Sequence, residues 1–186
     1  MMIYLIRHGL TAGNLEKRYI GRTDEPLCQK GIEELSLLTY PRCGVLVCSP
    51  MKRCIQTAEL LFPGQELHIC EGLRECDFGS FEGKNYAELS GDPDYQRWID
   101  SQGEMRFPGG ESPDRFRKRC TEAFIRTVSA YSGISSLAFV VHGGTIMSIL
   151  EKFALPHRSY YDWHTENGHG WLCRYDGGKI TIPEKL

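Results

Sequence analysis

The chain has 186 residues, of which 41% are hydrophobic and 25% are charged, and its formal net charge is −2. This length suits one domain with a continuous core, because single domains of roughly 150–200 residues are common. The near-neutral balance of charge gives no reason to expect a nucleic acid or an anionic membrane as partner.

The start of the chain and its cysteines indicate a reducing compartment. Arg7 interrupts the first apolar run, which is therefore too short for a signal peptide or for a membrane helix of about 20 residues. None of the eight cysteines forms a C-x-x-C pair, and several lie within apolar stretches. We therefore expect a cytoplasmic protein whose cysteines are reduced, buried side chains that hold no zinc.

Short apolar runs alternate along the chain with stretches of helical period. Runs rich in β-branched and aromatic residues predict strands at 2–7, 45–49, 66–71 and 137–142, and a hairpin over 170–183 with its turn at Asp176-Gly177-Gly178. The expected helices cover 31–39, 51–62, the stretch that opens at Ser112-Pro113, and 144–154. Because helices separate continuously apolar strands, we expect an α/β fold with a parallel sheet covered on both faces.

Residues 77–111 break this alternation. They contain many glycine, proline and aromatic residues and two short stretches that we expect to be helical, 84–90 and 93–101. We interpret residues 77–111 as an insertion that packs like a cap over one end of the sheet, within a single domain that spans residues 1–186.

Polar residues that could carry chemistry follow each predicted strand. In open α/β sheets, ligands bind beyond the carboxyl ends of the strands. The residues at these positions are Arg7 and His8 after the first strand, Arg53 in the helix after the second, Glu75 after the third, and His142 and Gly143 after the fourth. Each one alone is more often structural, but the predicted topology places all of them on one rim.

This set of side chains suits a phosphoryl group. Arg7 and Arg53 would present planar guanidinium groups that match phosphate oxygens, and His142 would add an imidazole N–H donor. The helix that opens at Gly143 would contribute backbone N–H groups and the positive end of its dipole, and Asn14 could supply a further neutral donor.

His8 and Glu75 would supply the chemistry. Neighbouring cations disfavour the imidazolium form, so a neutral His8 could attack phosphorus and form a phosphohistidine. Glu75 could then give a proton to the leaving oxygen.

Other phosphate chemistries fit the sequence less well. A cysteine phosphatase loop needs five residues between its cysteine and its arginine, whereas Cys48 and Arg53 are separated by four. Cys120 and Arg126 have that spacing but lie in a helical stretch without glycine. The chain also lacks the G-x-x-x-x-G-K-[ST] nucleotide loop and any His/Asp cluster that would indicate a catalytic metal.

Six motifs, in this order along nearly the whole chain, resemble those of the histidine phosphatase superfamily, which is also called phosphoglycerate mutase-like. They are RHGLTAGN (7–14), GRTDEPLCQKG (21–31), CSPMKRCIQTA (48–58), LRECDFGSFEG (73–83), FPGGES (107–112) and VVHGGT (140–145). The resemblance implies a three-layer α/β/α sandwich with a mostly parallel central sheet, one antiparallel edge strand, and no metal or organic cofactor. It also implies His8 as the phosphorylated nucleophile, Glu75 as the proton donor, and a phosphate pocket formed by Arg7, Arg53 and His142 with the help of Asn14.

The resemblance leaves the substrate open. In length and layout the chain is most similar to the α-ribazole phosphatases of cobalamin synthesis, which implies a small phosphorylated metabolite such as α-ribazole 5′-phosphate as the substrate of a monomer or homodimer. Phosphoglycerate mutase-type phosphoryl transfer and a broad-specificity phosphatase remain alternatives, because a fold does not fix a substrate. An inactive binding module is disfavoured, since the whole set of chemical residues is present. One departure is Ile20, where many relatives carry a glutamine that reaches the phosphate.

Overall fold

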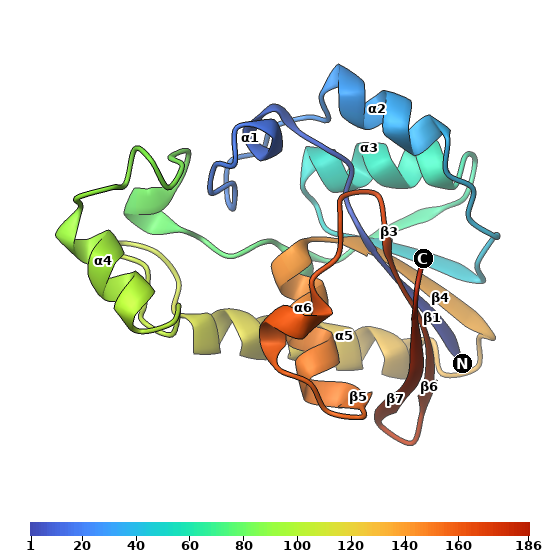
Figure 1. The fold of residues 1–186 in the computed structure, drawn as a ribbon. Helices are drawn as coiled ribbons and strands as arrows, with labels where there is room; N and C mark the ends of the chain where they lie inside the picture. Colours follow the sequence, from blue (N-terminus) through green and yellow to red (C-terminus); the bar gives the residue numbers. More distant parts are fainter.

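The computed structural model describes residues 1–186, except for the side chain of Ile182. At its centre is a seven-stranded sheet in the order β3-β2-β4-β1-β6-β7-β5 (Figure 1). The strands are β1 (Met2–Arg7), β2 (Val45–Cys48), β3 (Leu67–Ile69), β4 (Ser136–Val141), β5 (Ala154–Leu155), β6 (Gly170–Asp176) and β7 (Lys179–Lys185). The predicted strands and the hairpin are confirmed, although β3 is shorter than expected, and β5 is too short to leave a pattern in the sequence.

The sheet is mostly parallel. Strands β3, β2, β4 and β1 run in one direction, and the register of β1 on β4 pairs Met2 with Ser136 and Arg7 with Val141. The antiparallel strand is β6, which pairs with β1 on one side and with β7 on the other. The carboxyl ends of β1, β2 and β4 therefore point the same way, and the residues that follow these strands meet at one edge of the sheet.

Helices cover both faces of the sheet, which confirms the three-layer α/β/α arrangement. The α-helices are α1 (Ala12–Leu15), α2 (Gln29–Ser36), α3 (Lys52–Leu61), α4 (Pro93–Asp100), α5 (Pro113–Ala130) and α6 (Gly143–Phe153). Three 3₁₀ helices join them: η1 (Glu71–Leu73), η2 (Gly79–Phe81) and η3 (Tyr160–Trp163). Helices α2 and α3 lie on one face and α5 and α6 on the other (Figure 1).

The alternation of side chains along β1 divides the core into two layers. Ile3 and Leu5 belong to the same buried cluster as Phe124 of α5. Ile6 points to the other face, where its cluster includes Ala58 of α3. Since successive side chains of a strand point to opposite faces, one apolar strand can serve both helical layers.

The insertion differs from its prediction at residues 84–90. The helix expected there is wrong: this stretch forms turns, and Asn85 Oδ1 accepts the backbone N–H groups of Ala87 and Glu88, each at 3.1 Å. Asn85 thus caps a single turn, in which the N–H of Leu89 donates to the carbonyl oxygen of Asn85 at 3.0 Å, and Gly91 with a positive φ of 86° follows before a helix forms. The second expected helix is confirmed as α4, which Asp92 caps by accepting two backbone N–H groups.

Aromatic side chains hold the insertion together. Phe81, Phe107 and Phe116 are buried in one cluster, against which Tyr95 and Trp98 pack. The insertion extends past the amino end of α5, on the side of the molecule away from the termini (Figure 1).

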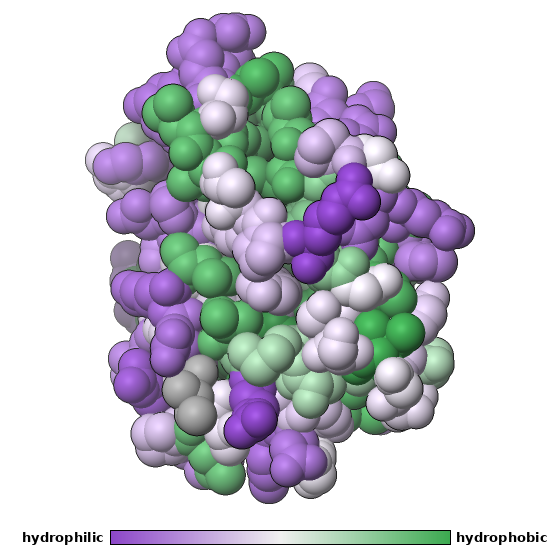
Figure 2. All heavy atoms as spheres, turned by 90° about the vertical axis from the view of Figure 1, so that its right-hand side faces the viewer, coloured by the Kyte–Doolittle hydropathy of each residue, from purple (hydrophilic) through white to green (hydrophobic). Residues whose placement is uncertain are grey.

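The side that carries both termini has a mixed surface. Figure 2 shows hydrophobic atoms gathered in the upper half of this face, level with α2 and α3 in Figure 1. Leu37, which follows α2, and Leu60 of α3 are 83% and 44% exposed. Within the part of the chain that the structure describes, no helix is long and apolar enough to cross a membrane.

Candidate active site

The residues predicted for the site lie where strands end and helices begin. Arg7 is the last residue of β1 and His8 follows it, while His142 follows β4 and caps α6, which opens at Gly143. Arg53 is the second residue of α3 and follows β2. Glu75 comes two residues after η1, and Asn14 lies in α1. These positions belong to the edge of the sheet at which β1, β2 and β4 end.

His8 is buried and held in one orientation. Its Nδ1 lies 2.7 Å from the carbonyl oxygen of Gly9, so Nδ1 carries the proton and donates it, which leaves the lone pair on Nε2. Burial lowers the pKa of His8 well below its usual value, the positive charges of Arg53 and Arg7 lower it further, and the Gly9 carbonyl opposes them. The imidazole is therefore neutral at neutral pH, with Nε2 available as a nucleophile.

His142 lies edge-on to His8. The two ring centroids are 5.2 Å apart with 67° between the planes, and His142 Nε2 lies 2.8 Å from Ser49 Oγ. Burial, and then the charge of Arg53, lower the pKa of His142 well below its usual value. Because Ser49 engages Nε2, an anion would have to bind at Nδ1, which Cys54 Sγ contacts at 3.8 Å.

The amino end of α6 is open toward the same place. His142 makes no side-chain capping bond to this helix, so its first N–H groups are not satisfied in the usual way. A Cβ on Gly143 would lie 3.4 Å from Arg7 Nε, so this guanidinium group packs directly against the start of the helix. Backbone donors and the helix dipole thus add to a cationic side chain, an arrangement that favours an anion.

The two arginines are anchored but retain free donors. Arg53 is fully buried, and its Nη1 and Nη2 donate to the carbonyl oxygens of Thr23 at 2.8 Å and Gly21 at 2.9 Å. Arg7 Nη1 donates to the carbonyl oxygen of Thr165 at 2.8 Å. The Nε atoms of both arginines are buried without a partner among the described residues. Buried unpaired donors are costly, and a bound oxyanion would satisfy them.

Glu75 has the properties of a proton donor. Its Oε1 accepts the backbone N–H of Cys76 at 2.9 Å. Burial raises the pKa of this carboxyl, although the Cys76 and Gly144 N–H groups and the two arginines oppose the shift. A larger fraction of Glu75 is therefore protonated near neutral pH than of an exposed glutamate.

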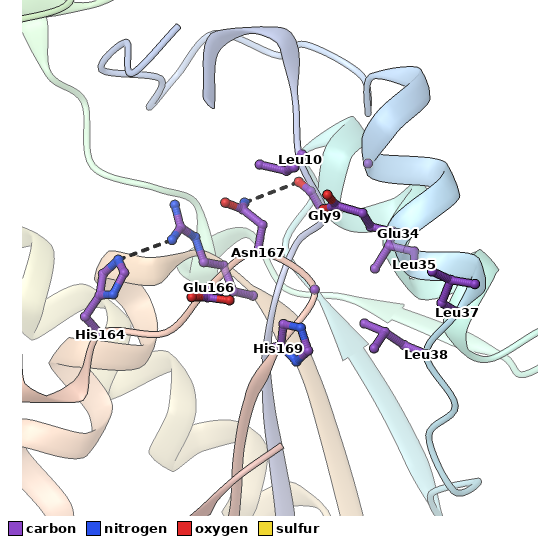
Figure 3. Close-up of a pocket in the computed structure, with 13 residues that line it drawn as sticks. Gly9, Leu10, Glu34, Leu35, Leu37, Leu38, His164, Glu166, Asn167 and His169 are labelled. Atoms are coloured by element: carbon purple, nitrogen blue, oxygen red, sulfur yellow. Dashed lines mark hydrogen bonds between the residues drawn. The ribbon is translucent and has the colours of Figure 1, made fainter. Parts of the chain in front are cut away.

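Asn14 is oriented by a residue that the sequence did not single out. Asn14 Oδ1 accepts the N–H of Thr11 at 3.2 Å and Asn167 Nδ2 at 3.1 Å, which fixes the amide so that its NH₂ group is the free donor. Asn167 Nδ2 also lies 3.0 Å from the carbonyl oxygen of His8 and 3.4 Å from that of Gly9, and the latter bond is drawn in Figure 3. The Asn-Gly pair at 167–168 reads as a turn in the sequence and gives no hint of this contact.

Two further polar residues brace the site, and the sequence places both only within longer motifs. Thr57 Oγ1 accepts the N–H of Gly9 at 2.9 Å and donates to the carbonyl oxygen of Arg53 at 2.6 Å, so it ties β1 to α3. Glu82 Oε1 accepts the N–H groups of Gly21 and Thr23, at 2.8 and 2.9 Å. The carbonyl groups of these same two residues anchor Arg53.

The loop at 164–169 borders a cavity of about 580 Å³, which Arg7 also lines (Figure 3). His164 Nε2 lies 3.5 Å from Arg7 Nη1, whereas His169 Nδ1 lies 3.1 Å from the carbonyl oxygen of Leu186. Of the two histidines, His164 is thus the one that contacts the predicted site. The side chain of Ile20 lies against Gly13, where an added Cβ would be 2.4 Å from it.

The site is built for an anion, and its donors are nitrogen atoms. Among the described residues, no group of three or more His, Cys, Asp or Glu side chains could hold a metal ion. Two arginines, an open helix start, a neutral imidazole and a carboxyl of raised pKa are groups with which an α/β protein could bind a phosphoryl group and transfer it to histidine.

Comparison with known proteins agrees with that class. The family model described as the histidine phosphatase superfamily (branch 1) matches residues 3–184, and the chain belongs to this family. An adenosylcobalamin/alpha-ribazole phosphatase of Salmonella typhimurium is 28% identical over 177 residues, which cover 90% of this chain and 87% of that protein. A broad-specificity phosphatase of Saccharomyces cerevisiae is 32% identical over 80% of this chain and 68% of its own. The structure of the alpha-ribazole phosphatase of Shigella flexneri aligns with a TM-score of 0.87 at 25% identity, over 98% of this chain and 94% of that one.

Proposed function

We propose that the protein hydrolyses phosphate monoesters through a phosphohistidine on His8, without a metal or an organic cofactor. The observation that carries this proposal is the state of His8: a buried, neutral imidazole whose Nδ1 is bound to the Gly9 carbonyl and whose Nε2 is free. The positive charges of Arg7 and Arg53 lower the pKa of His8 further. The Nε atom of each arginine is buried without a partner among the described residues and would donate to the phosphoryl oxygens. Membership of the histidine phosphatase superfamily supports this chemistry.

The reaction has two steps. In the first, His8 Nε2 attacks phosphorus, the ester P–O bond breaks, and Glu75 gives its proton to the leaving oxygen. In the second, Glu75, now a carboxylate, takes a proton from a water molecule that attacks the phosphohistidine. The N–P bond breaks, inorganic phosphate leaves, and the lone pair returns to Nε2. Arg7, Arg53, His142, Asn14 and the N–H of Gly143 stabilise the charge on the phosphoryl oxygens in both steps.

The substrate that we propose is a small phosphorylated metabolite, with α-ribazole 5′-phosphate of cobalamin synthesis as the first candidate. The names of the relatives from Salmonella typhimurium and Shigella flexneri support this choice. The name of the yeast relative supports the alternative, a phosphatase of broad specificity. We further propose that the protein acts in the cytoplasm as a monomer or homodimer; its eight free cysteines suit a reducing compartment.

A panel of esters assayed in the presence of EDTA tests the proposed activity. We expect release of phosphate from p-nitrophenyl phosphate in EDTA and its loss in His8→Ala. On α-ribazole 5′-phosphate, phosphoserine and 3-phosphoglycerate, a preference of several orders of magnitude in kcat/KM identifies a dedicated enzyme, and a flat profile identifies a generalist. Isomerisation of 3-phosphoglycerate without net release of phosphate would overturn the proposed hydrolysis and show mutase activity.

A further inference from the structure

Glu75 borders two cavities of different character. One has a volume of about 330 Å³ and a lining rich in charged side chains, Arg74 and Arg119 among them. The other has a volume of about 240 Å³, and its aromatic lining includes Phe78, Trp98, Phe107, Phe116, Tyr160 and Tyr161. Either cavity could receive part of a leaving group that takes its proton from Glu75.

Two arginines of the charged cavity, Arg74 and Arg119, already have partners. Arg119 Nη2 lies 2.8 Å from Glu111 Oε2, and Arg74 Nε lies 2.7 Å from Glu71 Oε2. Arg119 also donates to the backbone carbonyl groups of Gly72 and Arg74. A leaving group that entered this cavity would have to displace these interactions, so the cavity offers little to a neutral organic group.

The aromatic cavity shares a wall with the carboxyl group of Glu75. A Cβ on Gly144 would lie 2.8 Å from Glu75 Oε1 and 3.0 Å from the ring of Phe116, so the carboxyl, the start of α6 and this ring meet at one point. Tyr160 closes the same wall by donating its hydroxyl to the carbonyl oxygen of Gly144 at 3.2 Å. Gly144, Phe116 and Tyr160 all line the cavity.

We propose that this cavity binds a planar aromatic ring carried by the leaving group of the substrate. The inference rests on the proposed phosphatase function and specifies the class of ester on which that function acts. Aromatic side chains favour another ring in a tilted or edge-on arrangement, and Trp98 and Phe107 already meet this way, with centroids 5.4 Å apart. The volume lies below the range of about 300–1,000 Å³ that is typical of sites for drug-sized ligands, so it suits one flat ring system.

Three esters with similar primary alkoxide leaving groups test the ring directly. They are ethyl phosphate, 2-cyclohexylethyl phosphate and 2-phenylethyl phosphate. We expect kcat/KM for the phenyl ester to be at least tenfold higher than for ethyl phosphate and about threefold higher than for the cyclohexyl ester. Both differences should come from a lower KM for the phenyl ester. Equal values for all three esters would overturn the aromatic subsite and leave the phosphatase function standing. A lack of turnover of all three and of p-nitrophenyl phosphate would overturn the phosphatase function and the subsite with it.

Substitution of Tyr161, which lines the cavity, tests the same subsite from the side of the protein. The residue is 60% exposed, so Tyr161→Ala removes a ring without opening the core. We expect the ratio of kcat/KM for the phenyl ester to that for ethyl phosphate to fall about fivefold in Tyr161→Ala and to be kept in Tyr161→Phe. Tyr86 lies in the insertion, is 63% exposed and is not part of the lining, so Tyr86→Ala provides the control. A ratio that is unchanged in Tyr161→Ala, or that falls as far in Tyr86→Ala, would contradict the proposal.

Discussion

At the scale of single residues, the two proposed chemical groups are tuned in opposite ways by burial. Burial lowers the pKa of His8 and raises the pKa of Glu75, because it disfavours the charged form of each group. One side chain is thus kept neutral as a base and nucleophile, and the other is kept partly protonated as an acid. The charges of Arg7 and Arg53 act on both groups, and opposite pKa shifts of two groups in one site are a recurring sign of acid–base roles.

The role of Glu75 predicts a loss of activity on an unactivated ester. Glu75→Gln should lower kcat on an alkyl phosphate by about 10²–10⁴-fold, which is the usual contribution of a general acid. It should lower kcat on p-nitrophenyl phosphate less, because that leaving group needs little protonation. Glu71→Gln, a change at an exposed glutamate four residues earlier, is the control and should keep the wild-type rates. Equal losses on both esters would argue against proton donation by Glu75.

The raised pKa of Glu75 predicts the alkaline side of the pH profile. As pH rises through the pKa of Glu75 in the folded protein, the proton needed by the leaving oxygen is lost, so kcat/KM on the alkyl ester should fall. The acidic limb should lie well below pH 6.5, because the pKa of His8 is depressed. Profiles of the wild type and of Glu75→Gln, measured from pH 4 to 9, check both limits. An alkaline limb that persists unchanged in Glu75→Gln would contradict the assignment.

At this scale the sequence indicated candidate residues and a neutral His8, but not the hydrogen bonds that orient them. Strand ends and motif order pointed to His8, Arg53 and Glu75 as candidates. The Nδ1–Gly9 hydrogen bond that fixes the tautomer of His8, and the contact of Asn167 with Asn14, depend on loop geometry that no periodicity encodes. Short polar contacts between segments 153 residues apart in the chain leave no local signature.

At the scale of elements, the site depends on hydrogen bonds that tie β1 to the start of α3. Thr57 is fully buried and joins the N–H of Gly9 to the carbonyl oxygen of Arg53. The loop of the proposed nucleophile and one arginine of the proposed phosphate pocket are thereby held by the same side chain. Glu82 supports Arg53 in a similar way, because it binds the N–H of Gly21, whose carbonyl oxygen accepts from Arg53 Nη2.

Removing the Thr57 hydroxyl should therefore cost both stability and activity. Thr57→Val leaves the buried N–H of Gly9 unpaired, which should lower the free energy of unfolding by about 1–3 kcal/mol. We also expect KM for phosphate esters to rise, since the position of His8 relative to Arg53 is loosened. Thr127→Val is a matched control, because Thr127 Oγ1 only donates to Ala123 within α5. Urea unfolding and steady-state kinetics of the two variants measure the difference, and equal effects would contradict the bracing role.

Elements with strong local signals were predictable, and one short stretch with a helical start was not. The Ser112-Pro113 start of α5 is confirmed, with Ser112 Oγ accepting the N–H of Arg115. The helix expected at 84–90 is absent: Asn85 caps the stretch, but only one turn follows, closed by the bond from Leu89 N–H to the Asn85 carbonyl oxygen, before Gly91 takes a positive φ of 86°. Periodicity alone does not show that such a stretch ends after one turn.

At the scale of the whole molecule, the buried histidines make stability depend on pH. The pKa values of His8 and His142 lie well below 6.5 in the folded protein, whereas in the unfolded chain these groups bind protons near pH 6.5. As pH falls below about 6.5, the unfolded state takes up protons that the folded state resists, so the free energy of unfolding falls.

Removing one of these histidines should reduce that dependence. When the pH is lowered from 7.5 to 5.5, the Tm of His142→Gln should fall by less than the Tm of the wild type. The control His157→Gln changes an exposed residue and should keep the slope of the wild type. Thermal unfolding across this range, in a buffer without phosphate, provides the measurement. A slope in His142→Gln as steep as in the wild type would show that the buried imidazole does not carry the effect.

The fold as a whole was the most predictable feature. Four apolar strands and the helices between them suffice to specify a mostly parallel sheet, because short right-handed connections leave few topologies. The aromatic cavity beside Glu75 was not predictable. It is formed by residues of the insertion, α5, α6 and η3, which are brought together only by the packing of the complete chain.

The proposed mechanism requires a covalent bond between His8 and phosphorus during turnover. Mixing the protein with a ³²P-labelled phosphate ester and quenching within milliseconds in alkali should trap one labelled histidine per chain, stable to base and lost in acid. Peptide mapping should place the label on His8, and His8→Asn should carry none. Turnover of the ester without a trapped label, or a label that maps to another residue or survives acid, would contradict the account.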